Sequence, residues 1–177
     1  MSNYNTFTEM SAKAGAQSVT GTAETILLAG GTGSTNLVLA IPAWKTVFDG
    51  KSFVIRCTGY VTTDTTATAT LKMYYSSTAA GAKTTQISTT GASQSLATTS
   101  TTFCHEDWLS WDSTSQEIRG QQYGWMGSTV LSATVVTNPV TSIADLSAGV
   151  YFMPTITFSA VTTAATVKIT DFSIDMN

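Results

Sequence analysis

Two successive runs of alternating side chains, between residues 51 and 75, constrain the fold of this chain most strongly. One face of the first run carries Phe53, Ile55, Cys57, Gly59 and Val61. The corresponding face of the second run carries Ala67, Ala69, Leu71, Met73 and Tyr75. Because successive side chains of a strand point to opposite faces, this period predicts half-buried antiparallel strands. The apolar face of such a sheet needs a second layer to cover it.

The remaining segments predict a chain made of strands throughout. Eight or nine short strand candidates and no long helix indicate an all-β protein, an antiparallel β-sandwich of jelly-roll-like topology over residues 18–177. One candidate strand covers Val19–Ala29. Pro154 predicts that its own strand lies at a sheet edge or contains a bulge. The apolar parity changes between Ile169 and Phe172, which predicts a β-bulge near Thr170–Asp171.

Residues 1–17 have few apolar groups and no sustained period. Tyr4, Phe7 and Met10 are spaced by three, but the small residues that follow them dilute the pattern. We therefore expect an extended or partly disordered N-terminal arm outside the core.

The composition excludes several partners. Charged residues make up 11% of the chain, against about 25% in an average soluble protein. A surface of Thr, Ser and Ala suits close contact with other proteins. The net charge of −3 and the lack of a Lys/Arg cluster argue against nucleic acid. No apolar stretch approaches the roughly 20 residues that a membrane span needs, and the N-terminus lacks a signal-peptide pattern. Synthesis in a cytoplasm is expected.

The residues with catalytic or ligand chemistry are few. Cys57 and Cys104 lie in separate strand candidates, and we predict two free thiols, with a disulfide as the alternative. The only histidine, His105, falls in Cys104-His105-Glu106-Asp107. Strand geometry places His105 and Asp107 on one face, too few ligands for a zinc site, and no G-x-S-x-G elbow is present. We expect a hydrogen-bonded His105–Asp107 pair and no catalytic site, metal or cofactor.

Four aromatic residues come from two strand candidates that we expect to pair: Trp108, Trp111, Tyr123 and Trp125. Exposed aromatic rings anchor protein contacts or stack on sugar rings. Cross-strand packing in the core also explains them. All three interpretations stay open at the level of the sequence.

The segment F-D-G-K-S-F-V-I-R-C-T-G-Y-V-T-T, followed by A-T-A-T-L-K-M-Y-Y, resembles the pattern of jelly-roll virion proteins of tailed bacteriophages. In that pattern the first strand is followed by a Thr-rich partner. The later segments F-C-H-E-D-W-L-S-W and I-R-G-Q-Q-Y-G-W-M-G extend the resemblance, which covers roughly residues 48–127.

The resemblance implies a non-enzymatic virion protein, a capsid decoration (cement) protein that binds major capsid protein subunits as a homotrimer or homodimer. The expected contact residues are those of the arm and the aromatic set: Tyr4, Phe7, Met10, Trp108, Trp111, Tyr123 and Trp125. The alternative is a carbohydrate- or receptor-binding module of a tail fibre or baseplate, which would use the Trp and Tyr residues in an exposed cleft. A tail-tube or neck component is a third possibility.

Overall fold

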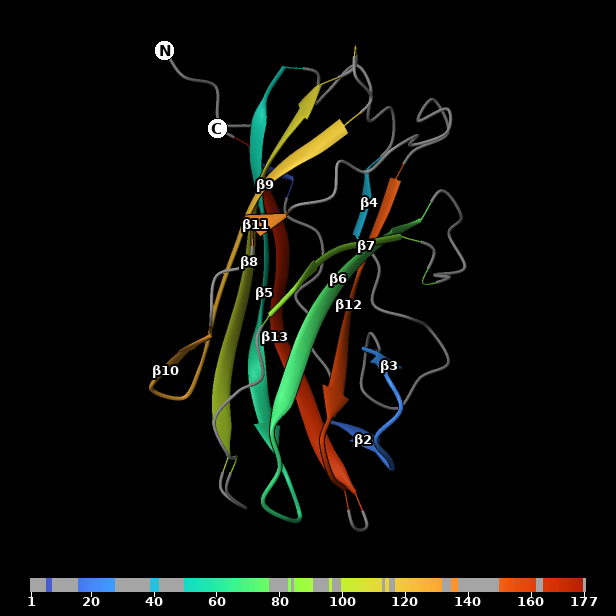
Figure 1. Ribbon diagram of the computed structural model, residues 1–177, viewed down its shortest axis with the longest axis vertical. Helices are drawn as coiled ribbons and strands as arrows, with labels where there is room; N and C mark the ends of the chain where they lie inside the picture. Colours follow the sequence, from blue (N-terminus) through green and yellow to red (C-terminus); the bar gives the residue numbers. More distant parts are fainter. Residues whose placement is uncertain are drawn as a thin grey trace.

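Antiparallel strands in two facing sheets form the fold (Figure 1). The computed structural model describes residues 6–7, 16–27, 39–41, 50–76, 83, 85–90, 96, 100–112, 114, 117–131, 135–136, 150–161 and 164–176. These residues contain strands and turns, and no helix among them is long and apolar enough to cross a membrane. The prediction of an all-β antiparallel sandwich is confirmed.

The first sheet runs in the order β1-β13-β5-β8-β9-β10, with β2 also on β13 and β11 also on β9. Its strands are β1 (Thr6–Phe7), β2 (Gln17–Val19), β5 (Ser52–Thr62), β8 (Thr101–Asp112), β9 (Glu117–Met126), β10 (Thr129–Leu131), β11 (Val135–Val136) and β13 (Ala165–Met176). The second sheet runs β3-β12-β6-β7, with β4 also on β12. Its strands are β3 (Thr25–Ile26), β4 (Leu39–Ile41), β6 (Ala69–Ser76), β7 (Thr85–Thr89) and β12 (Val150–Phe158).

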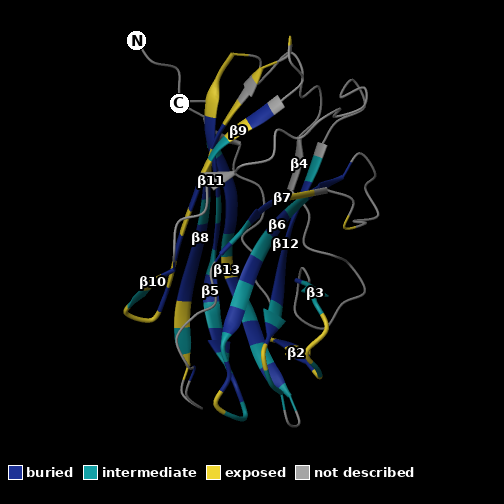
Figure 2. Cartoon of the chain, in the orientation of Figure 1, coloured by how far each residue is buried: buried dark blue, intermediate teal, exposed yellow. Residues whose placement is uncertain are grey.

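The two alternating runs of the sequence form β5 and β6, and their burial alternates as predicted except at Val54, which is buried as well (Figure 2). They do not pair with each other, however. Strand β5 pairs with β13 and β8, whereas β6 pairs with β12 and β7, so the chain crosses between the sheets after Thr62. Phe53 of β5 packs against Phe152 of β12 with ring centroids 6.4 Å apart, and both rings are fully buried. The core therefore lies between the two sheets.

The predicted single strand over Val19–Ala29 is wrong. Its beginning belongs to β2, which pairs with β13 in the first sheet, and its middle forms β3, which pairs with β12 in the second. The apolar residues at both ends do face the core, since Val19 and Leu27 are buried. The physical reason is that this segment contributes to both layers by crossing between them.

The predicted bulge in the last strand is confirmed, because the β13–β5 register shifts between Ile169 and Asp171. The shift lets Ile169 and Phe172 face the core together. The prediction for Pro154 is wrong. Strand β12 has neighbours on both sides, and Pro154 lies between its pairing with β4 and its pairing with β3. Its carbonyl accepts a hydrogen bond from the Leu27 amide, and Pro154 itself belongs to neither the β3 ladder nor the β4 ladder, so its lack of an N–H is tolerated there.

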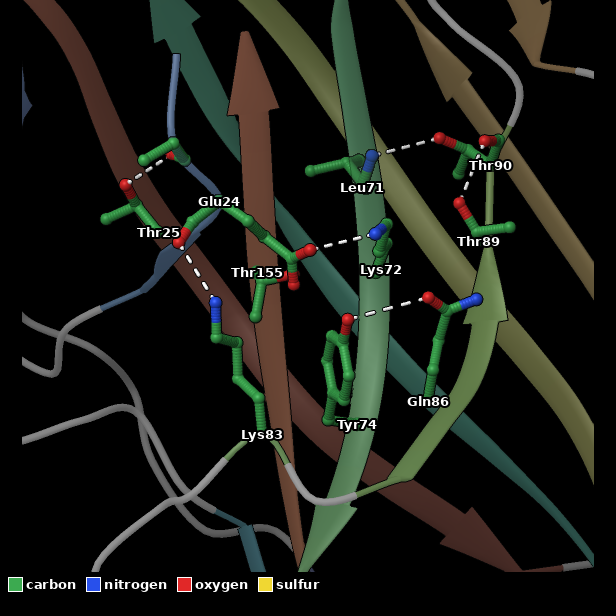
Figure 3. Close-up of polar contacts among 11 residues, drawn as sticks. Glu24, Thr25, Leu71, Lys72, Tyr74, Lys83, Gln86, Thr89, Thr90 and Thr155 are labelled. Atoms are coloured by element: carbon green, nitrogen blue, oxygen red, sulfur yellow. Dashed lines mark hydrogen bonds and ion pairs between the residues drawn. The ribbon is translucent and has the colours of Figure 1, made fainter. Parts of the chain in front are cut away.

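A cluster around Glu24 attaches the crossing segment to the second sheet (Figure 3). The Glu24 carboxylate accepts hydrogen bonds from Lys72 Nζ at 2.8 Å and from Thr155 Oγ1 at 2.9 Å. Lys83 Nζ also donates to the Glu24 backbone carbonyl at 3.2 Å. Partial burial alone would raise the pKa of Glu24, but the hydrogen bonds from Lys72 and Thr155 outweigh it and lower the pKa. Glu24 thus holds the crossing segment, just before β3, against both β6 and β12.

Candidate binding surface

Three of the predicted aromatic residues lie on the solvent-facing side of the first sheet. Trp108 of β8 is 46% exposed, and Tyr123 and Trp125 of β9 are 45% and 43% exposed. The predicted pairing of β8 with β9 is confirmed. Core packing is therefore the wrong interpretation for these three residues. The inward positions of β8 are instead occupied by Phe103, His105, Asp107 and Leu109.

The other predicted contact residues are placed only in part. Trp111 lies in β8 opposite Ile118 of β9, and its side chain is outside the described part of the structure. Phe7 lies in β1, opposite Ile174 of β13. Tyr4 and Met10 fall outside the described residues. The structure thus brings Trp108, Tyr123 and Trp125 onto one face of the first sheet, and Phe7 lies in β1, at the other end of that sheet's strand order from β10.

Trp108 and Tyr123 line an open groove of about 660 Å³ together with Glu106, Gly120 and Gln121. We call these five residues the aromatic groove. The two rings are nearly perpendicular, at 85°, with centroids 6.5 Å apart. This edge-to-face arrangement is one that aromatic pairs favour. The volume falls within the range of about 300–1,000 Å³ that is usual for small-molecule sites.

Polar contacts fix the side chains of the groove. Glu106 Oε1 accepts a hydrogen bond from Arg56 Nε at 2.6 Å, and Glu106 Oε2 accepts one from Trp108 Nε1 at 3.2 Å. Burial would raise the pKa of Glu106, but the hydrogen bonds from Arg56 and Trp108 outweigh it and lower the pKa. The Tyr123 hydroxyl donates to Gln121 Oε1. Each ring is therefore tied to a neighbouring polar side chain.

Gly120 is the one groove residue for which no side chain fits. A Cβ atom built there would lie 1.9 Å from the backbone oxygen of Trp108. The close approach of β9 to β8 at this point thus depends on glycine. Sequence reasoning did not single out Arg56, Glu106, Gly120 or Gln121 as site residues. The period of two was the available signal, since it places Glu106 with Trp108 and Gln121 with Tyr123.

A second exposed surface lies on the β9–β10 hairpin. Trp125 is directly opposite Val130, whose side chain is 80% exposed, and we call this pair the hairpin patch. The turn between them contains Gly127 with φ of 62°, a conformation that glycine adopts without steric cost. Trp125 is not among the described residues that line the aromatic groove. The two surfaces are therefore neighbouring but distinct.

The buried polar residues of β8 behave differently. The predicted His105–Asp107 pair is confirmed, with His105 Nε2 3.0 Å from Asp107 Oδ2. Ser88 Oγ of β7 lies 2.9 Å from the same nitrogen. A catalytic triad needs the serine and the acid on different nitrogens of the imidazole. Since His105 and Asp107 are only 2% and 0% exposed, this cluster links the two sheets in the interior.

The two cysteines are free and buried, as predicted. Cys57 faces the core from β5, and Cys104 lies on the other face of β8, opposite Thr58. Burial raises the pKa of both thiols, that of Cys104 to about 12. Thiolate is the reactive form of cysteine, so burial keeps both thiols in the less reactive protonated form.

Among the described residues, no group of three or more His, Cys, Asp or Glu side chains is arranged to hold a metal ion. Comparison of the chain with models of known protein families finds no match. Comparison with curated proteins finds no match either. The described surfaces and the resemblance of residues 48–127 are therefore the features that bear on function.

Proposed function

We propose that this chain is a non-enzymatic structural protein of a bacteriophage virion, a capsid decoration protein of jelly-roll-like topology. In this proposal it binds major capsid protein subunits as a homotrimer or homodimer and stabilises the assembled shell. The class of partner comes from the resemblance described above. The contact surface comes from the geometry of the first sheet.

The hairpin patch is the observation that carries the proposal. Trp125 and Val130 are apolar, largely exposed and directly opposite each other on a hydrogen-bonded hairpin. Tryptophan is enriched among the residues that dominate protein interfaces, and a rigid strand pair loses little conformational freedom on binding. A stable interface buries about 800 Å² per partner. In this proposal the patch forms its centre, and the arm with Tyr4, Phe7 and Met10 extends it.

Decoration of this kind requires no chemistry. A protein that binds the assembled shell and not its free subunits stabilises the shell by mass action. An oligomer that contacts several capsid subunits at once gains further affinity, because its second contact forms at a high effective concentration. The low charge of the chain favours such close contact, since few charged groups need to be desolvated.

The test uses empty capsids of the phage that encodes the chain, assembled without it. Light scattering gives the oligomeric state, and sedimentation of capsid mixtures gives the stoichiometry. We expect a dimer or trimer that co-sediments at a fixed ratio, and we expect Trp125→Ala to weaken attachment at least roughly tenfold. Trp108→Ala is the matched control, with the same residue type and similar exposure outside the patch.

A soluble oligomer that never co-sediments with capsids would overturn the proposal. So would virions that lack the protein and withstand heat and osmotic shock as well as complete ones. Equal attachment of the wild type and the Trp125→Ala variant would reject the hairpin patch as the contact surface.

A further inference from the structure

The aromatic groove keeps two large rings in a fixed exposed arrangement. Trp108 and Tyr123 each remain nearly half exposed although they touch at right angles. Neighbouring polar side chains fix the orientation of both rings, because Trp108 Nε1 donates to Glu106 and the Tyr123 hydroxyl donates to Gln121. The groove is therefore organised before any ligand arrives, which lowers the entropic cost of binding.

Hydrogen-bonding groups lie beside the rings. Each carboxylate oxygen of Glu106 has more than one acceptor position, and the contacts from Arg56 and Trp108 occupy one on each oxygen. Gln121 accepts from Tyr123 through Oε1, and its amide nitrogen carries two donor hydrogens. A ligand in the groove thus meets apolar rings, acceptors and donors within one small volume.

The charge of the groove is nearly balanced. Arg56 Nε lies 2.6 Å from Glu106, and Arg56 Nη1 lies 3.5 Å from Asp175. Two carboxylates face one guanidinium among these groups, which disfavours an anionic ligand, and the Glu106 carboxylate at the groove is itself paired with Arg56. A purely apolar partner would bury Glu106 and Gln121 without replacing their water hydrogen bonds, which is unfavourable. The chemistry that fits is a flat apolar ring face edged by hydroxyl groups that both donate and accept.

We propose that the aromatic groove binds a neutral carbohydrate, with a pyranose ring against Trp108 and Tyr123 and its hydroxyl groups bonded to Glu106 and Gln121. This site uses neither residue of the hairpin patch, Trp125 or Val130, although both surfaces lie on the same face of the first sheet. For a ligand of one or two sugar rings we expect a dissociation constant on the order of 1 mM.

The experiment uses the full chain and a panel of soluble neutral polysaccharides: dextran, mannan, galactomannan and arabinogalactan. Affinity electrophoresis measures retardation by each, and tryptophan fluorescence during titration with the matching hexasaccharide gives the affinity. Polygalacturonate serves as the charged comparison. We expect retardation by at least one neutral polysaccharide and none by polygalacturonate.

Variants locate the binding. Trp108→Ala and Gln121→Ala are expected to weaken binding at least roughly tenfold, since each removes a stacking surface or a donor. Trp125→Ala, a matched tryptophan of similar exposure outside the groove, is expected to bind as the wild type does. Thermal melting checks that each variant folds. If Trp108→Ala is unstable, Trp108→Phe and the exposed Gln121→Ala replace it.

Three results would overturn the proposal. The first is no retardation by any neutral polysaccharide in the panel. The second is binding that Trp125→Ala abolishes while Trp108→Ala and Gln121→Ala preserve it. The third is binding to polygalacturonate alone. Loss of capsid attachment by Trp108→Ala without any glycan binding would likewise assign the groove to a protein contact. Because Trp125→Ala reports on the capsid and Trp108→Ala on the glycan, either proposal fails without the other.

Discussion

The two faces of β8 carry similar chemistry in opposite environments. On the outer face, Glu106 pairs with Arg56 at 2.6 Å beside the exposed Trp108. On the inner face, Asp107 pairs with His105 at 3.0 Å in a site that solvent does not reach. The consecutive acidic residues Glu106 and Asp107 therefore have different roles. The outer carboxylate orients a surface that a ligand can reach, whereas the inner one belongs to the contact between the sheets.

The two pairs should differ first in how much each contributes to the free energy of unfolding. An exposed ion pair contributes about 0–1 kcal/mol, because water screens it and solvates either partner alone. Removing one partner of a buried hydrogen-bonded pair leaves the other polar group without compensation, which costs about 1–3 kcal/mol before any loss of packing is counted. The following predictions test the comparison, beginning with the largest effect.

His105→Ala is expected to destabilise the protein by about 3–5 kcal/mol, because it leaves a buried polar group unpaired and a cavity where the imidazole was. It removes the hydrogen-bond partner of Asp107 Oδ2, while Asp107 Oδ1 has no hydrogen-bond partner in the structure. Urea unfolding followed by circular dichroism measures the change. The double variant His105→Leu/Asp107→Leu should recover much of the loss, since an apolar pair needs no compensation. A loss of stability below about 1 kcal/mol for His105→Ala would show that the buried pair contributes no more than an exposed ion pair does.

Gly120→Ala is expected to cost about 1–3 kcal/mol, because its Cβ would collide with the Trp108 backbone oxygen at 1.9 Å. The two strands must separate to admit it, which also moves the groove rings. Thermal melting gives the stability, and near-ultraviolet circular dichroism reports the Trp108–Tyr123 arrangement. Gly50→Ala is a useful contrast, since nothing lies within 4 Å of a Cβ there and only its φ of 68° opposes the change.

Glu24 extends the comparison to a partly buried ion pair. Its pKa is lowered in the folded protein, so the stability it provides is complete above its ordinary value of 4.5 and is lost as the pH falls through the folded-state value. Glu24→Gln should therefore be less stable at pH 7 and should lose less stability than the wild type on acidification. Urea midpoints measured from pH 7 down to pH 3 test this. Parallel curves for the two proteins would contradict the assignment.

Glu106→Gln is expected to have the smallest effect on stability, below about 1 kcal/mol. The substitution should change mainly the surroundings of Arg56 and Trp108, because a neutral amide replaces the charged acceptor of both side chains. The emission of Trp108 should change while the melting temperature stays nearly constant. A large fall in melting temperature would place Glu106 among the structural residues and remove the contrast with Asp107.

The sequence predicts the local part of this fold well. Alternation in β5 and β6 and the bulge in β13 follow from the period of two, and the pairing of β8 with β9 follows from their being consecutive strands. The sheet to which a strand belongs is harder to predict, because alternation identifies the buried face of a strand but not the layer in which the strand lies. Val19–Ala29 shows this, since its apolar residues serve two layers in succession.

The candidate site was predicted in part for a related reason. Both parities of β8 contain large apolar residues, Phe103 and Leu109 on one and Trp108 on the other. Residue type alone therefore did not decide which parity faces the core. In the structure the set of Phe103, His105, Asp107 and Leu109 is buried against the opposite sheet, where Ser88 of β7 meets His105. Once that set is known, Trp108, Tyr123 and their polar partners follow by parity.

The burial of both native thiols has a practical consequence. Cys57 and Cys104 are the only cysteines in the chain, and neither reacts readily in the folded state. A single cysteine introduced at Val130, with no removal of the native ones, would therefore be the one position that a maleimide dye or a cross-linker modifies. A dye placed there reports on the hairpin directly, and a cross-linker placed there captures whatever protein the hairpin touches.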